Sequence, residues 1–201
     1  MSESNKLIDF YSNPILLFEK WFAEAKQKEI NDPNAMNLAT ISKNLKISSR
    51  MVLLKSFDEN NFIFYTNENS KKGKSIKYNS YVALNFYWKS LRRQIRIEGA
   101  ATKISSKESD DYFNTRPMES KIGAWASKQS EYLQNRKDLE NDITNYNNKF
   151  NENKITRPPH WVGYSVNPIL IEFWQEMPFR LHDRIEYIKK EDEWVSKKLY
   201  P

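Results

Sequence analysis

The sequence contains no cysteine, and this absence removes several classes of site. Without thiols the chain can form no disulfide, iron–sulfur cluster or zinc ribbon, and it has no thiol nucleophile. Histidine is almost as scarce: there are two, His160 and His182, too few for an HExxH motif or a multi-histidine metal site. The sequence therefore predicts a functional site without a metal.

Glycine and long apolar runs are also in short supply. The four glycines, Gly73, Gly99, Gly123 and Gly163, lie too far apart for a GxGxxG dinucleotide loop or a Walker P-loop. No run approaches the ~18 apolar residues of a spanning helix, and the N-terminal MSESNKLIDF has no signal-peptide core. We therefore expect a cytoplasmic protein without membrane contact. If it is a redox enzyme, its carrier is an organic cofactor held by side chains.

What the chain does have is the composition of a packed domain with an excess of positive charge. Its 201 residues are 39% hydrophobic and 14% aromatic, which suits one domain with a sizeable core. The 32 Lys and Arg against 26 Asp and Glu give a net charge of 32 − 26 = +6. This balance fits a protein that binds nucleic acid, one that binds small phosphorylated ligands, or one with a lysine-rich solvated surface.

The residue pattern predicts an α+β fold, mostly antiparallel β, in which a barrel-like sheet has flanking helices. Residues 1–12 are expected to form a flexible N-terminal tail, and residues 13–201 a single domain. Caps and apolar spacing predict helices at residues 13–28, 70–77, from 105, around 122–125 and at 139–150. Strands are expected at residues 35–41, 81–88, 91–103, 161–166, 169–175, 179–189 and 193–199.

The stretch Ser49–Ser70 is expected to form a β-hairpin around the turn Asp58–Asn61. Cations, hydroxyls and the start of the next helix could converge there on a phosphate, because a helix N-terminus offers free N–H groups and partial positive charge. The alternative is a plain hairpin followed by a solvated, lysine-rich helix. This first constellation comprises Arg50, Lys55, Tyr65, Thr66, Ser70, Lys71 and Lys72.

A second constellation is formed by Tyr112, Arg116 and Ser120. Tyr112 and Arg116 lie one helical turn apart, and Ser120 could continue their face beyond Pro117. Together with Lys55 they would form a second anion site. The alternative is an exposed helix end with a capping serine.

A third constellation lies near the C-terminus. At a period of two, Arg180, His182 and Arg184 share one face of an expected strand. Three adjacent cationic or cation-capable groups repel one another unless an anion or a π surface lies against them. The alternative is a histidine with a purely structural role.

Several segments of the sequence together resemble a known family. They are Arg50–Lys55, Phe64–Asn67 with Ser70–Gly73, Arg93–Gly99, Tyr112–Pro117, Ser120–Trp125, Ser127–Ser130, Ile171–Gln175 and Arg180–Arg184, all in the family's order. On these motifs the chain closely resembles the pyridoxine (pyridoxamine) 5′-phosphate oxidases, FMN enzymes with a split β-barrel. The resemblance extends from Asn13 to Pro201.

The resemblance implies a role for each candidate residue, carried over by its position in the motifs. The substrate phosphate would be bound by Lys55, Tyr112, Arg116 and Ser120, with the catalytic groups Arg180 and His182 over the substrate ring. In this family FMN lies at a homodimer interface with contributions from both subunits. The implied FMN contacts are Arg50, Tyr65, Thr66, Ser70, Lys71, Lys72, Gln94, Gln129, Ser130, Trp174 and Arg184.

The implied reaction is the FMN-dependent oxidation of pyridoxamine 5′-phosphate and pyridoxine 5′-phosphate to pyridoxal 5′-phosphate, with O2 as acceptor and hydrogen peroxide released. Nucleic acid and membrane are not expected partners. Two alternatives stay open. Another split-barrel flavoprotein, of the flavin reductase type, would be yellow but indifferent to these substrates. A basic nucleic-acid-binding protein would be colourless and show salt-dependent retention on DNA or RNA.

Overall fold

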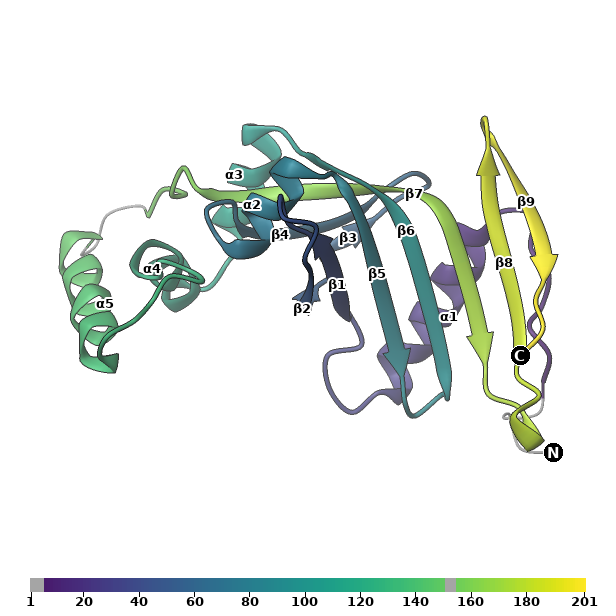
Figure 1. The fold of residues 1–201 in the computed structure, drawn as a ribbon. Helices are drawn as coiled ribbons and strands as arrows, with labels where there is room; N and C mark the ends of the chain where they lie inside the picture. The colour runs from purple at the N-terminus through teal and green to yellow at the C-terminus, as the bar shows by residue number, and fades with distance from the viewer. Residues whose placement is uncertain (1–5, 151–154) are drawn as a thin grey trace.

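The computed structural model describes residues 6–150 and 155–201, which form one branched antiparallel sheet with flanking helices (Figure 1). The strands in these residues are β1 (Ala35–Ile41), β2 (Ile47–Leu53), β3 (Ser56–Phe57), β4 (Phe62–Asn67), β5 (Tyr81–Trp88), β6 (Arg93–Lys103), β7 (Trp161–Gln175), β8 (Asp183–Lys190) and β9 (Glu193–Lys198). The helices are α1 (Pro14–Lys28), α2 (Lys71–Tyr78), α3 (Ser106–Asn114), α4 (Met118–Ala126) and α5 (Arg136–Phe150).

The sheet branches at β7. The strand order is β2-β1-β5-β6-β7-β4-β3, while β8 also pairs with β7 and β9 pairs with β8. One edge of β7 is paired with β6, and the other edge is shared, with β4 on residues 161–166 and β8 on residues 170–175. The sheet therefore curves into a half-barrel, and the predicted α+β class with mainly antiparallel strands is confirmed.

Helix α1 closes the core of the half-barrel. Asn13 caps it as predicted: its side chain accepts a hydrogen bond from the Ile15 N–H at 2.9 Å. Leu17, Phe18 and Trp21 on its inner face are at most 4% exposed. The Phe18 ring lies edge-on to Phe62 at 4.9 Å, so the helix is fixed by aromatic contacts with the sheet.

The predicted turn at Asn167-Pro168 is wrong, because β7 runs through these residues without a break. They pair with Ala100 and Gly99 of β6 at a register shift between Glu98 and Gly99. The irregular pairing accommodates a proline, which cannot donate a ladder hydrogen bond. A side chain at position 99 would place its Cβ 2.1 Å from the Asn167 carbonyl oxygen, so the close approach requires glycine.

The predicted hairpin Ser49–Ser70 is also wrong in its first strand. Strand β2 pairs with β1, with Arg50 opposite Leu38, and the short β3 pairs with β4 across the turn Asp58–Asn61. The local turn was therefore predicted correctly, but the partner of β2 was not. Strand β4 pairs with β7 along one edge and with β3 along the other. Strand β2 instead pairs with the outer edge of β1.

The expected strand 179–189 begins later than predicted, at Asp183. Pro178–Arg180 forms a short 3₁₀ turn instead, with positive φ angles of 59° at Phe179 and 63° at Arg180. Arg180 therefore lies in the turn and His182 precedes β8, so Arg184 is the only one of the three in the strand and the predicted shared face does not form. Positions 180, 182 and 184 alternate in the sequence as they would on a strand, but the backbone is not extended at residues 178–180.

The first described residues contact the C-terminal strands rather than lying free. Residues 1–5 of the predicted tail lie outside the described part of the chain. Within residues 6–12, Ile8 is buried and its N–H donates to the Asp183 carboxylate at 2.7 Å. The Tyr11 N–H donates to the hydroxyl of Tyr187 at 3.3 Å. This part of the predicted flexible tail is therefore packed against β8.

The remaining helices lie near the other end of the sheet. Figure 1 shows α4 and α5 projecting beyond it, with α3 and α2 closer to the strands. Helix α3 begins with the predicted capping box, in which Ser105 and Glu108 exchange hydrogen bonds. No helix in the described residues is long and apolar enough to cross a bilayer.

The contact between Gly99 and Asn167 can be tested by substitution. Gly99→Ala should lower the free energy of unfolding by about 3 kcal/mol, the upper range for overpacking, because a backbone oxygen cannot swing away. Gly123→Ala in α4 is the matched control: nothing lies within 4 Å of the added Cβ, and alanine in a helix should stabilise by roughly 0.5–1 kcal/mol. Urea denaturation measures both changes, and a fully stable Gly99→Ala variant would contradict the bulge geometry.

Candidate active site

A pocket of about 650 Å³ opens where the ends of β2, β4 and β7 meet α2, α3 and α4. Its size lies in the range typical of sites for small molecules and cofactors. It brings together side chains from two of the three predicted constellations. The predicted residues that line it are Lys55, Tyr65, Thr66, Lys72, Tyr112, Arg116, Ser120 and Gln129.

Aromatic rings form one wall of the pocket. The Tyr65 ring stacks on Tyr112 at 4.2 Å and on Trp161 at 4.9 Å, nearly parallel to both. Gly163 leaves room for this stack, since a Cβ there would lie 2.7 Å from the Tyr65 ring. Burial raises the pKa of the Tyr65 hydroxyl, which therefore stays protonated at neutral pH. The wall offers a flat apolar surface with polar tips.

Arg116 lies against this wall with part of its guanidinium unpaired. Its Cζ is 4.7 Å from the centroid of the Trp161 ring, and its Nη1 is buried without a hydrogen-bond partner in the described residues. Burial lowers the pKa of Arg116, although arginine remains charged under ordinary conditions. The residue follows α3 instead of extending it, because the helix ends at Asn114. A buried, unpaired guanidinium N–H group is a binding position for an anion.

Lys72 is a second buried cation in the pocket. Its Nζ donates to Gln129 Oε1 at 2.8 Å and to Thr66 Oγ1 at 3.1 Å. Burial, helped by the positive charge of Arg50, lowers the pKa of Lys72 to about 8. None of the ion pairs in the described residues involves Lys55, Lys72 or Arg116, so no protein carboxylate neutralises the pocket.

Four predicted residues border the pocket instead of lining it. Arg50 in β2 donates to the Leu38 carbonyl at 3.0 Å and lies close enough to Lys72 to influence its charge. Ser70 is fully buried and caps α2 by accepting from the Gly73 N–H, and Lys71 is the exposed first residue of that helix. Ser130 follows Gln129 with a positive φ of 73°.

The other predicted residues form a second group at the far end of β7. Gln94, Trp174 and Arg184 lie side by side on β6, β7 and β8. The His182 ring packs on Trp174 at 4.5 Å, and its Nδ1 accepts the Met177 N–H at 3.2 Å.

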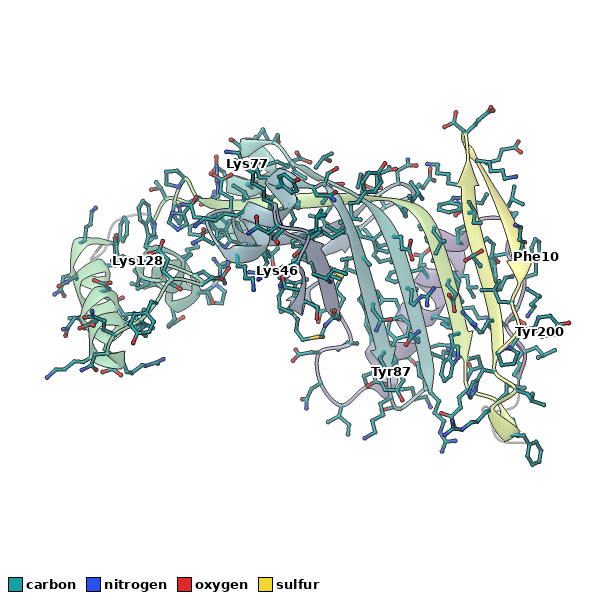
Figure 2. The ribbon with its side chains drawn as sticks, in the orientation of Figure 1. Phe10, Lys46, Lys77, Tyr87, Lys128 and Tyr200 are labelled. Atoms are coloured by element: carbon teal, nitrogen blue, oxygen red, sulfur yellow. The ribbon has the colours of Figure 1, made fainter. Side chains whose placement is uncertain are left out.

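The two groups are far apart within one chain. Trp161 and Trp174 are 13 residues apart on β7, which corresponds to about 40 Å at the rise of a β-strand. Figure 2 shows Lys128, the neighbour of Gln129, and Tyr200, whose carbonyl accepts from Arg184, at opposite ends of the molecule. One chain therefore cannot bring both groups to the same small ligand.

The sequence missed several residues of the pocket, of which Trp161 is the most important. It contacts Tyr65, Arg116 and Phe113, yet it was assigned only to a strand. The signal available was its place directly after Pro158-Pro159-His160, where a loop delivers an aromatic residue to a strand start. Asn67, Thr115 and Ser127 also line the pocket and were not predicted.

In chemical terms the pocket is suited to a planar ligand with a negative charge. The aromatic wall can stack on rings, and the unneutralised cations can bind phosphate. An FMN molecule fits this set of groups, because its phosphate would supply a negative charge beside Lys72, which has no carboxylate partner. No three His, Asp or Glu side chains in the described residues are grouped in a way that could hold a metal ion.

Comparisons with known proteins agree with this description. A model of the pyridoxamine 5′-phosphate oxidase family matches residues 22–150, and one of the pyridoxine 5′-phosphate oxidase C-terminal dimerisation region matches residues 161–201. The pyridoxine/pyridoxamine 5′-phosphate oxidases of Bartonella quintana and Caulobacter vibrioides are 50% and 47% identical to the chain. These alignments cover 94% of the chain and 92% and 85% of the two relatives.

Two solved structures have the same fold. PhzG from Burkholderia lata 383, in complex with tetrahydrophenazine-1-carboxylic acid, is 31% identical with a TM-score of 0.90, covering 96% of this chain and 95% of that one. A pyridoxamine 5′-phosphate oxidase-related, FMN-binding protein from Nostoc punctiforme is 18% identical with a TM-score of 0.74, covering 92% of this chain and 97% of that one. The chain therefore belongs to the pyridoxamine 5′-phosphate oxidase family, a family of FMN-dependent oxidoreductases, as its motifs predict.

Proposed function

We propose that this protein oxidises pyridoxamine 5′-phosphate and pyridoxine 5′-phosphate to pyridoxal 5′-phosphate. O2 would be the final acceptor, reduced to hydrogen peroxide. The observation that carries the proposal is the pair formed by buried Lys72 and half-buried Arg116, which have no carboxylate partners in the described residues and lie beside a stacked aromatic wall. Both the cofactor and the substrate bring a phosphate and a flat ring, so the pocket must hold two anions. The 50% identity to a named oxidase supports the same choice.

The proposed substrate phosphate site is formed by Lys55, Tyr112, Arg116 and Ser120. All four line the pocket, and the unpaired Nη1 of Arg116 has a donor free for a phosphate oxygen. Lys55 lies between β2 and β3, with its Nζ 6.0 Å from the Tyr112 ring centroid. Binding here would hold the aminomethyl or hydroxymethyl carbon in one orientation, which is the part of catalysis that positioning supplies.

The proposed FMN phosphate site is next to it, around Lys72 and the first turn of α2. Arg50 supplies further positive charge there, and the N–H groups at the start of α2 point their partial positive charge outward. Thr66, Ser70, Lys71, Gln129 and Ser130 are the other expected contacts from this end of the chain. FMN, when bound, would supply the redox chemistry, and these residues would bind and orient the flavin.

We also propose that a homodimer completes the site. Trp174 lies at the end of β7 opposite the pocket, and Gln94, Arg180, His182 and Arg184 lie near it. These five residues are too far from the pocket of their own chain, so they would act in the pocket of the partner. The match of residues 161–201 to a dimerisation region supports this arrangement. His182 Nδ1 accepts a backbone N–H, so a neutral imidazole carries its proton on Nε2 and can donate it to the substrate.

The reaction can be tested by mixing the FMN-loaded protein with pyridoxamine 5′-phosphate without oxygen. The visible absorption of the flavin should bleach, and admission of O2 should restore it with one hydrogen peroxide per pyridoxal 5′-phosphate formed. NADH is the control for a flavin reductase, and tetrahydrophenazine-1-carboxylic acid, the compound bound in the PhzG structure, is the second control. A flavin that bleaches with either control compound but not with pyridoxamine 5′-phosphate would refute the proposal.

The substrate phosphate site can be tested with Arg116→Met, which keeps the apolar stem on Trp161 but removes the guanidinium. Loss of charge-assisted hydrogen bonds worth about 1.5–3 kcal/mol should raise KM for pyridoxamine 5′-phosphate roughly ten- to hundredfold. FMN content should be unchanged. The control is Arg136→Met on α5, whose side chain is exposed and paired with Glu140. An unchanged KM, or a loss of FMN, would show that Arg116 has another role.

The pH dependence of FMN binding tests the role of Lys72. With a pKa of about 8 in the empty site, the side chain is charged below pH 8 and increasingly neutral above it. The FMN phosphate is a dianion throughout this range, so the apparent Kd should rise about tenfold between pH 7 and pH 9. Lys72→Met should bind FMN weakly and without this slope. Equal slopes in both proteins, measured by flavin fluorescence, would assign the titration to another group.

A further inference from the structure

Glu172 is a buried carboxylate held between two arginines near the end of β7. It is 1% exposed. Its Oε1 accepts from Arg184 Nε at 2.8 Å and lies 2.8 Å from Arg184 Nη2. Its Oε2 lies 2.6 Å from Arg96 Nη2. The carboxylate thus pairs with two guanidinium groups on separate oxygens: Arg184 through a hydrogen bond to Oε1, and Arg96 through an ion pair at Oε2 that lacks hydrogen-bond geometry.

Arg184 has a third fixed contact. Its Nη1 donates to the carbonyl oxygen of Tyr200 at 2.9 Å. A guanidinium has five N–H groups, and these three contacts leave one free on each Nη. The plane of the guanidinium is therefore set by Glu172 on one side and by the C-terminal backbone on the other, and one N–H on each Nη has no partner among the described residues.

We propose that Glu172 is a positioning residue for FMN binding, acting through Arg184. This inference rests on the proposed function, in which Arg184 contacts the cofactor in the partner's pocket. Without Glu172, the guanidinium would lose two of its three contacts. Glu186 lies directly opposite Glu172 in the register and two residues from Arg184 on the same face, so it offers a competing carboxylate. Glu172 therefore determines which way the two free donors point.

Arg96 has a different part in this cluster. It forms an ion pair with the other carboxylate oxygen and its side chain is about half exposed, so it neutralises charge at Oε2 while Arg184 pairs with Oε1. When one of two cations beside a buried carboxylate is removed, the carboxylate still forms an ion pair with the other cation. Arg96→Gln should therefore leave both Oε1 contacts, and with them the FMN affinity, close to those of the unmodified protein.

The test is the FMN affinity of Glu172→Gln, measured by titrating the apoprotein and following the quenching of flavin fluorescence. We expect Kd to rise about ten- to hundredfold, by analogy with the effect of removing groups that orient metal-ligating residues. The matched control is Glu24→Gln, which removes a glutamate paired with Arg93 on β6, outside the proposed site. It should alter stability without altering Kd.

A double-mutant cycle separates positioning from general destabilisation. In an Arg184→Ala background, the Glu172→Gln change should have no further effect on Kd, because the residue through which it acts is gone. Additive effects, or a Glu172→Gln protein that binds FMN as tightly as the unmodified protein, would overturn the inference.

If Glu172→Gln does not fold, the double variant Glu172→Gln/Arg96→Gln is used, because it removes one of the two arginines that would lose their carboxylate partner. Its Kd is compared with that of Arg96→Gln alone. The same ten- to hundredfold rise is expected; equal values would overturn the inference. Failure of the proposed function would look different. An unmodified protein that binds no FMN, or whose flavin is not reduced by pyridoxamine 5′-phosphate, would refute that function before any variant is made.

Discussion

Strand β7 pairs with β6 along one edge and with both β4 and β8 along the other, and the sheet curves because of this shared edge. Its hydrogen bonds continue through Asn167 and Pro168, since Gly99 on β6 has no side chain to block them. The same strand carries Trp161 at the pocket and Trp174 at the opposite end. The distance between the two groups of predicted site residues is therefore fixed by the length of one element.

The cationic side chains near the two ends of β7 differ in whether they have a carboxylate partner. In the pocket, Lys72 and Arg116 are partly desolvated without a carboxylate, and burial lowers the pKa of each. This arrangement disfavours the empty site and favours an anionic ligand, which supplies the missing charge. Near Trp174, by contrast, Arg96 and Arg184 share the buried carboxylate of Glu172. The cations at one end lack carboxylate partners and are the proposed phosphate site, whereas the arginines at the other end are paired with Glu172.

Local signals in the sequence predicted most of the helices and strands. The caps Asn13, Ser70 and Ser105 are the observed helix starts, and the alternation of Ile95 and Ile97 marks the buried face of β6. The errors concern which strand pairs with β1, whether β7 continues through Asn167–Pro168, and where β8 begins. The spacing of the cationic residues in the sequence also predicted the cations of the pocket. It could not show that they meet Trp161, or that Trp174 and its neighbours lie at the opposite end, because both depend on the pairing along β7.

The length of β7 has a consequence for the thermodynamics of the proposed dimer. If each cofactor site takes residues from two chains, then flavin binding and subunit association are linked equilibria. Whatever free energy the flavin adds to the dimer, dimerisation adds to flavin affinity by the same amount. Dilution alone would then weaken cofactor retention, and saturation with the flavin would hold the subunits together at concentrations where the empty chains separate.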